Sequence, residues 1–579
     1  NLVESYTYEG RGNILTFTDG RGKVTTSTYD AGSNVLTTRD GEGFLTQFTY
    51  DGNGKLLTTT DPHGAVTTNV YDAASNLIRT TDPAGVSNYT YDAAGRRLTE
   101  TRVRTIPGGT ETLETRFAYD AAGRLIETTH PDGTTSRNEY DLAGNLTATI
   151  DQLGRRTTYT YDASNRKIRT TFPDATFESS QYDAEGQRVA GVDRAGRTTT
   201  FTFDSRGRVK REIALHGTFT ERQYNAAGRL SGVLDENGHG FTQTFDAAGR
   251  VLTTVDATGR TTTNTYDIVG NRIASTDSGG QTATYEFDRR NLLTRTNFPG
   301  GTNERYVYNQ AAQLTSTFDA DNAETRLMLD LAGRVTQVTN PLNQSWSFTY
   351  DEIGNRVSQT DPLGRITRFE YDRLRRETRR TLPLGASQQR QYDAAGNLIQ
   401  RVDYGGAPTT YTYDSNNRLL RRTHPDASFV TFSYNATGER LTATDARGTT
   451  TYSYDVRDRL TQVTQPDGTS LQYAYDPASN LSSRTANVGA ASLTQAFGYD
   501  FANRLLTVTD SQARAYTYSY NPAGKVASLA QPNGVATAYS YGAVNRLTGL
   551  ITSRGGTTLQ SFAYTLSPVG RRTRIDEVG

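Results

Sequence analysis

Residues 119–125 read Tyr-Asp-Ala-Ala-Gly-Arg-Leu, and this phrase decides the fold. Its first six residues return unchanged at 91–96, and residues 392–398 differ from it only by Asn in place of Arg. Looser copies extend from Tyr8 to Leu566. A phrase that recurs along a whole chain marks a repeat protein, in which each copy is one unit that stacks on its neighbours.

The spacing of the copies is nearly constant. We anchor each copy on the residue before its Asp, and most successive anchors, such as Tyr119 and Tyr140, are 21 residues apart. The longest gap, 28 residues before Tyr119, contains an insertion at 101–110. Because the repeat continues in phase afterwards, we interpret this insertion as a protruding loop. No stretch lies outside the repeat, which predicts one continuous unit over 1–579 without a second domain or linker.

Each repeat predicts two β-strands and two turns. Thr367, Phe369 and Tyr371 alternate with residues of the opposite face, which is the period of a strand. The anchor is followed by Asp-x-x-Gly, here called the YD turn, whose Gly accepts a positive φ. The other turn, here called the linking turn, is often Asp-Pro-x-Gly, as at 361–364. Because the two turns alternate, every strand is expected to be antiparallel to its neighbours.

The predicted fold class is all-β, a long antiparallel β-hairpin strip wound into a spiral, hollow shell. Roughly 54 strands at about 4.8 Å spacing form a ribbon about 260 Å long, and open sheets rarely stay flat beyond about ten strands. Only 34% of the residues are hydrophobic, which argues against one thick core. One face carries Tyr, Phe and Leu and has to be covered. We therefore expect successive turns of the spiral to shield one another.

A second period of 42 residues supports coiling. Phe203 and Phe245 replace Tyr at anchors 42 residues apart, and the site two residues before the anchor is aromatic at Phe48 but polar at Asn69. We expect alternate hairpins of the N-terminal half to meet different surroundings. Unequal burial of Phe48 and Asn69 is the test of this hypothesis.

The composition excludes several classes of function. The chain has 62 basic and 62 acidic residues, so no long-range field directs it to nucleic acid or to an acidic membrane. It has no Cys, which excludes disulfides, thiolate catalysis and cysteine metal sites. No run is long enough to span a bilayer, and no signal peptide is visible at Asn1. The only Met is Met328, so we expect a piece of a larger protein.

The basic residues are nearly all Arg, and this excess has two interpretations. Arg pairs with carboxylates and stacks on tyrosine rings, but a biased genomic base composition produces the same excess. Rows of aromatic residues with interleaved Arg are able to hold sugars or a nucleic-acid strand by stacking. The alternative, which we favour, is that these rings form the buried face of the sheet.

No residue pattern predicts catalysis, a cofactor or a metal, and we expect no enzyme and no catalytic, cofactor-binding or metal-binding residues. The anchor Tyr and its Asp recur too often for a single active site. We expect a half-buried Tyr whose hydroxyl finds a partner, and an Asp that accepts hydrogen bonds from its own turn. The acidic cluster at 319–324 lacks EF-hand spacing and is expected to be an exposed turn. The five His residues are scattered: His63, His130, His216, His239 and His424.

Tyr-Asp-x-x-Gly-Arg/Asn-Leu at a spacing of 21 residues, with Asp-Pro-x-Gly between copies, resembles the YD repeats of the RHS family. The resemblance covers essentially the whole chain. That family includes bacterial RHS polymorphic toxins, Tc-toxin C components, wall-associated toxins and teneurins. The resemblance implies a β-strip that spirals into a hollow shell, which in the toxin members encapsulates a C-terminal effector.

The chain departs from the toxin members at its end. Those members close with a motif resembling P-x-x-x-x-D-P-x-G-L, which is linked to self-cleavage. Here the Asp-Pro-x-Gly matches at 61–64, 82–85 and 361–364 lie mid-chain as repeat turns, and none is followed by Leu. We therefore expect no autoproteolysis within this chain.

The resemblance favours a structural role in a secreted or surface-exposed bacterial toxin. The expected partner is an encapsulated effector polypeptide outside this chain, with no nucleic acid, no cofactor and no membrane span. The alternative is a cell-surface adhesion or carbohydrate-binding module with surface glycans as partners. A toxin reading frame downstream supports the first hypothesis, and glycan binding by the isolated chain supports the second.

Overall fold

The computed structural model describes residues 4–578, and it is built from β-strands. Within this range it has 54 strands, from β1 (Ser5–Tyr8) to β54 (Arg572–Val578), and no helix. All 54 belong to one sheet in which each strand pairs antiparallel with the next. β1 pairs only with β2 (Ile14–Thr18) and β54 only with β53 (Thr557–Leu566), so the sheet is open. The predicted all-β strip of hairpins is confirmed.

The two chain ends lie partly outside this description. Asn1, where no signal peptide is expected, and Gly579 are not among the described residues. Residues 4–578 contain no helix that is long and apolar enough to cross a bilayer.

One repeat illustrates the local geometry. β13 (Thr135–Tyr140) ends on the anchor, β14 (Leu146–Ile150) returns beside it, and β15 (Arg156–Tyr161) begins the next repeat. The register between β13 and β14 shifts at the anchor, between Glu139 and Tyr140. The same shift recurs at other anchors. Such bulges increase the local right-handed twist, so each repeat contributes to the coiling of the strip.

The YD turn is closed by its own Asp, as predicted. Asp120 Oδ1 accepts hydrogen bonds from the backbone N–H groups of Ala122 (3.0 Å) and Arg124 (2.9 Å). Gly123 has a φ of 82°, in the region where other residues are strained. These contacts hold the pKa of the Asp120 carboxyl below its usual value, and the hydrogen bond from the Arg124 backbone is the largest cause.

The Arg of the phrase joins its repeat to the next one. Arg124 donates through Nε to Asp120 Oδ2 (2.7 Å) and through a terminal nitrogen to the backbone oxygen of Asp141 (2.8 Å). Its guanidinium lies 4.8 Å from the ring centre of Tyr140, the next anchor. The Tyr140 hydroxyl in turn donates to the backbone oxygen of Leu125 (3.1 Å), as predicted for the anchors. The Arg excess therefore has a structural role.

The same stacking of an Arg on the following anchor recurs along both halves of the chain. It is formed by Arg166–Tyr182, Arg208–Tyr224, Arg250–Tyr266, Arg334–Tyr350, Arg376–Tyr392, Arg418–Tyr434, Arg459–Tyr475 and Arg504–Tyr520.

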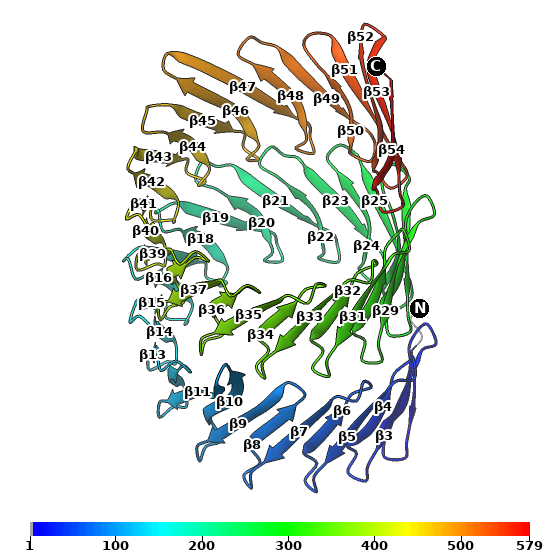
Figure 1. Ribbon diagram of the computed structural model, residues 1–579, viewed down its shortest axis with the longest axis vertical. Coiled ribbons are helices and arrows are strands. Elements are labelled where there is room, and N and C mark those ends of the chain that lie inside the picture. The colour runs from blue at the N-terminus through cyan, green and yellow to red at the C-terminus, as the bar shows by residue number, and fades with distance from the viewer. Residues whose placement is uncertain (1–3, 579) are drawn as a thin grey trace.

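The strip coils into a spiral of two laps, where a lap is one circuit of the spiral (Figure 1). The blue strands β3 (Val24–Tyr29) to β9 (Gly85–Tyr91) of the first lap lie beside the green strands β29 (Asn303–Tyr308) to β37 (Ser387–Tyr392) of the second. Hydrogen bonds between the laps join residues that are 221 to 270 positions apart. The laps are therefore stacked edge to edge.

This stacking corrects the expectation that turns of the spiral shield one another's faces. Strand–strand contacts are between neighbours in the sheet, and the laps meet through their turns. The hydrophobic residues that are buried are few: Leu113, Ala148, Ala190, Ile353 and Phe369. The Tyr face is instead covered by Arg side chains of the same sheet, because a single curved layer has no second layer to pack against.

The expected difference between alternate hairpins is wrong with respect to burial. Phe48 and Asn69 are both half-buried. Asn69 donates to the backbone oxygen of Leu56 (3.3 Å), which also accepts the hydroxyl of the anchor Tyr71 (3.1 Å). A polar side chain is therefore accommodated at this site because it shares the acceptor of the anchor.

Candidate functional site

The two laps meet along a polar seam. Linking turns of one lap face YD turns of the next, and side chains of one bond to side chains of the other. The geometry is clearest at Arg197, whose two terminal nitrogens donate to Asp458 Oδ1 and Oδ2, both at 2.6 Å. This two-pronged pair is among the stronger kinds of protein hydrogen bond. Further pairs are Arg155–Asn417, Asn237–Asp476, Asp235–Asn503, Asp277–Asn545 and Asp321–Ser567.

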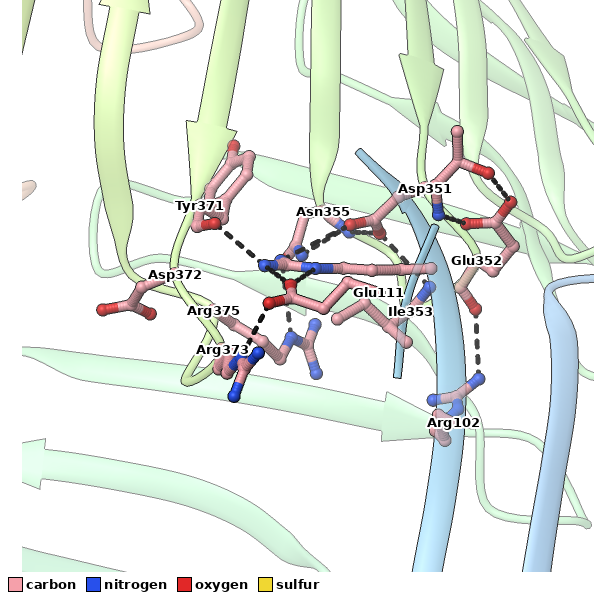
Figure 2. A network of polar contacts seen from close by, with 12 residues as sticks. Arg102, Glu111, Asp351, Glu352, Ile353, Asn355, Tyr371, Asp372, Arg373 and Arg375 are labelled. Atoms are coloured by element: carbon pink, nitrogen blue, oxygen red, sulfur yellow. Dashed lines mark hydrogen bonds and ion pairs between the residues drawn. The ribbon is translucent and has the colours of Figure 1, made fainter. Parts of the chain in front are cut away.

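The insertion of the first lap forms the most elaborate part of the seam. It is not a protruding loop, as the sequence led us to expect. It extends a hairpin of β10 (Arg97–Ile106) and β11 (Gly109–Tyr119), which stay paired up to Ile106 and Gly109. The end of this hairpin contacts two YD turns of the second lap, at 351–355 and 372–376 (Figure 2). We call the hairpin end and these two turns the clasp.

Arg104 lies at the centre of the clasp, and its side chain is only 2% exposed. Its guanidinium donates to Glu111 Oε2 through Nε (2.9 Å) and a terminal nitrogen (2.6 Å), and to the backbone oxygen of Tyr371 (2.9 Å). Asp351 Oδ2 lies 3.9 Å from the guanidinium. Glu111 also accepts from Arg373 Nε of the second lap (2.7 Å). A buried cation thus has carboxylates of both laps around it, as buried charges require.

Glu352 forms the second half of the clasp. Its carboxylate accepts from the backbone N–H and the hydroxyl of Thr105, both at 2.6 Å, and its backbone oxygen accepts from Arg102 (3.1 Å). Gly85 allows this approach, because a Cβ there would lie 3.1 Å from the Glu352 backbone oxygen and Cβ. The two laps are therefore in close steric contact here as well as hydrogen-bonded.

The carboxyl groups of the clasp are held ionised. Burial alone raises the pKa of Glu111, but hydrogen bonds from Arg373 and Arg104 outweigh it and hold that pKa below its usual value. Burial also opposes ionisation of Glu352, and the hydrogen bonds from Thr105 hold its pKa below the usual value. Both groups are charged at neutral pH, the state in which they join the laps.

A cavity of about 430 Å³ lies beside the clasp. Arg104, Glu111, Phe369 and Tyr371 are among its lining residues. The Arg104 nitrogens that face Glu111 and Tyr371 already have partners. These contacts join two edges of the sheet and leave no free catalytic group among the atoms named here.

The residues considered from the sequence take structural positions. Asp319 of the acidic cluster accepts from the backbone of its own turn, and Asp321 accepts the Ser567 hydroxyl across the seam (3.0 Å). The His239 ring contacts the Phe501 ring across the seam in a tilted arrangement, with 4.7 Å between the ring centres. Over residues 4–578, no group of three or more His, Asp or Glu side chains is placed to hold a metal ion.

The clasp itself was missed by sequence reasoning. The insertion carries a strand-like alternation, with Arg102, Arg104 and Ile106 on one side of β10, and this signal favours a hairpin over a loop. Its partners lie 247 to 267 positions away, at a distance that only the length of a lap determines.

Comparisons with known proteins match the repeat throughout most of the chain. The teneurin YD-shell family model matches residues 209–424. The RHS repeat model matches residues 50–87, 71–111, 101–135, 140–176, 182–218, 434–470, 454–491, 499–536 and 520–558. No curated protein matches this sequence.

Solved structures share the fold. The crystal structure of TcdB2-TccC3-TEV is 16% identical with a TM-score of 0.75, and that of TcdB2-TccC3-Cdc42 has the same values. The Photorhabdus luminescens Tc holotoxin pore is 15% identical with a TM-score of 0.72. Each match covers 97% or 98% of this chain but only 40% of the larger one. This chain therefore corresponds to less than half of each of those proteins.

Proposed function

We propose that this chain, which belongs to the RHS/YD-repeat family, is a wall segment of a toxin shell and encloses an effector polypeptide encoded outside residues 1–579. The observation that carries the proposal is the seam. It joins two laps of one open sheet edge to edge, and a strip joined in this way becomes a continuous wall. The mechanism is containment, in which the wall keeps the effector apart from its surroundings.

Side-chain chemistry on the sheet supports containment. Thr hydroxyls pair with each other across neighbouring strands, as in Thr28–Thr37 and Thr49–Thr58, both at 2.6 Å. A hydroxyl that already has a partner gains little from binding a passing chain. Such a surface suits a wall that touches a polypeptide without holding it. We propose no catalytic role, one continuous unit over 1–579 and a secreted or surface location on bacteria.

The alternative is a module that binds surface glycans. Sugar binding needs open aromatic faces, but anchor rings such as Tyr140 and Tyr182 carry a guanidinium at 4.8 Å. Phe177, on another strand, has Arg169 at 3.6 Å from its ring centre. The stacked Arg side chains therefore favour the wall over the glycan module.

Limited proteolysis of the natural full-length protein tests the proposal. We expect the region that follows residue 579 to resist trypsin in the intact protein and to be digested when expressed alone. Glu111→Ala should open the seam and increase cleavage of that region, whereas the exposed control Arg116→Ala should not. Equal digestion of the region in the intact and isolated forms, or strong binding of the chain to a glycan array, would overturn the proposal.

A further inference from the structure

Three successive repeats carry Arg at one equivalent position of the sheet. Each of these residues lies directly opposite the residue two places before an anchor, in the pairs Phe369–Arg380, Arg390–Arg401 and Tyr411–Arg422. Directly opposite residues point to the same side of a sheet, as do residues two apart along a strand, so these Arg side chains lie on the Tyr face. Many other repeats have Thr or an apolar residue at this position, as at Thr170 and Val338. Arg484 also holds it, but donates to Gln495 on the neighbouring strand (2.6 Å).

Arg380, Arg390, Arg401 and Arg422 form what we call the Arg row, which crosses β36 (Glu377–Thr381) to β40 (Leu419–Thr423) (Figure 1). On β37, Arg380 lies opposite Gln388 and Arg401 lies opposite Arg390. Successive repeats are therefore offset by two residues along the strands as well as by two strands. With about 3.4 Å per residue and about 4.8 Å between strands, the α-carbons of Arg380, Arg401 and Arg422 are spaced by roughly 12 Å. The row thus extends over roughly 24 Å of the Tyr face.

The positive charge of the Arg row is only partly neutralised. Glu377 is the only acidic residue within the strands β36 to β40, and its carboxylate accepts from both Arg380 (3.2 Å) and Arg390. Arg401 is exposed and Arg422 is half-buried, and no ion pair of residues 4–578 includes either of them. The Nε atoms of Arg380 and Arg422 are buried without a hydrogen-bond partner in the described part of the chain. Four guanidinium groups therefore share one carboxylate.

The Arg row opposes the stability of the sheet. Like charges directly opposite each other on two strands destabilise their pairing, and Arg390 and Arg401 are such a pair. A buried donor without a partner also costs free energy. The carboxylates of the adjacent linking turns, Asp403 and Asp426, accept hydrogen bonds from their own turns. A departure from local rules that brings no structural gain is expected at a functional site.

Carboxylates at a regular spacing are the chemistry that the Arg row fits. A guanidinium forms paired hydrogen bonds with a carboxylate, as Arg197 does with Asp458 in the seam. In an extended polypeptide, side chains four residues apart point to the same side and lie about 13 Å apart, close to the spacing of the row. A nucleic-acid strand needs open aromatic rings beside the cations. Phe369, at one end of the row, is 5% exposed and has the Arg380 guanidinium 5.3 Å from its ring centre, so it offers no ring face to a base.

We propose that the Arg row binds an acidic polypeptide segment, which crosses β36 to β40 on the Tyr face in an extended conformation. Asp or Glu at every fourth residue of that segment pairs with Arg380, Arg401 and Arg422 in turn. Thr pairs such as Thr28–Thr37, next to the anchor in sequence, lie on the opposite face of the sheet. Binding at the Arg row and containment by the Thr surface therefore concern different faces, and this inference does not depend on an enclosed effector.

Fluorescence anisotropy of a labelled peptide tests the proposal. The probe has Glu at every fourth residue with Ser between, and the control probe has Gln in place of Glu. We expect the chain to bind the Glu probe and not the Gln probe, with an affinity that falls as the salt concentration rises. Arg401→Gln with Arg422→Gln removes two pairings and should raise the dissociation constant about tenfold. Arg368→Gln with Arg421→Gln removes the same charge from exposed sites on the opposite face of β35 (Ile366–Tyr371) and β40, and should leave it unchanged.

Photo-crosslinking shows where the probe binds. A Glu probe that carries a benzophenone group should label residues within 377–423, and circular dichroism of each variant checks that the sheet is intact. No binding of the Glu probe, an equal loss of affinity in the two double variants, or labelling confined to other repeats would overturn the proposal. Oligothymidylate that binds more tightly than the Glu probe and is released by Arg401→Gln with Arg422→Gln would also overturn it, because the row would then be a nucleic-acid site.

Discussion

Replacement of Arg104 by Met is the sharpest test of the clasp. The change keeps an unbranched side chain in a site that is 2% exposed but removes the cation. The Glu111 carboxylate loses the two hydrogen bonds that Arg104 donates to it, and the backbone oxygen of Tyr371 loses one. Asp351, also 2% exposed on its side chain, loses the cation at 3.9 Å. Carboxylates of both laps then remain near each other with less compensation.

The magnitude follows from this loss. Breaking a buried ion pair by removal of one partner costs about 3–5 kcal/mol. Arg373 still pairs with Glu111 at 2.7 Å, so we expect the lower part of that range, about 3 kcal/mol. A cost of about 3 kcal/mol corresponds to a change of roughly 100-fold in the opening equilibrium of the clasp.

Native-state hydrogen–deuterium exchange is the appropriate assay, because repeat proteins open locally and a global unfolding midpoint averages over many units. Amides of β10 and β11 should lose about 100-fold in protection, and amides of β13 to β15 should keep theirs. Arg116→Met is the control on the same hairpin: this Arg is 67% exposed and its ion pair is with Glu114, so we expect little loss of protection. Equal effects of the two substitutions would refute the assigned role of Arg104.

Three further predictions concern the seam and the anchors. The folded-state pKa values of Glu111 and Glu352 lie below the ordinary value of 4.5. Their contribution to the stability of the clasp is therefore full above pH 4.5 and is lost as the pH falls further. Tryptic cleavage at the clasp should increase after acid treatment and not after treatment at pH 7. Gly85→Val should separate the laps near Glu352 and increase tryptic cleavage there. Gly109→Val should not, because a Cβ at Gly109 would have no neighbouring atom within 4 Å. Tyr392→Phe removes a 3.0 Å hydrogen bond to a backbone oxygen and should cost about 1 kcal/mol of local stability. Hydrogen exchange of the β37 amides measures this loss, and an unchanged exchange rate there would contradict the prediction.

The repeat phrase was sufficient to predict the strip. Strand period, turn chemistry and the alternation of two turn classes are local properties, and residues 119–125 already contain an anchor, a turn closed by Asp120 and the start of a strand. The hydroxyl partner of the anchor was also predictable in kind. It is a backbone oxygen such as that of Leu125, 15 residues before Tyr140.

The winding was not predictable in the same way. The number of repeats in a lap depends on small bends that accumulate over many bulges, and no single residue determines it. The partners of Arg104 and Thr105 were therefore hidden, and the insertion was misinterpreted as a loop. The cover of the Tyr face was also misjudged, because Arg124 reaches the next anchor and makes a second layer unnecessary.

The seam also constrains how such a gene is able to change in length. Each polar pair joins positions separated by about one lap, or about twelve repeats of 21 residues. Duplication of one repeat inside the spiral would move every later YD turn one place along the linking turns below it. Arg197 would then face the neighbour of Asp458, and the clasp would meet the wrong pair of turns. Lengthening by single repeats is therefore tolerated best outside the span from Arg21 to Ser567, where it shifts no pair of this seam.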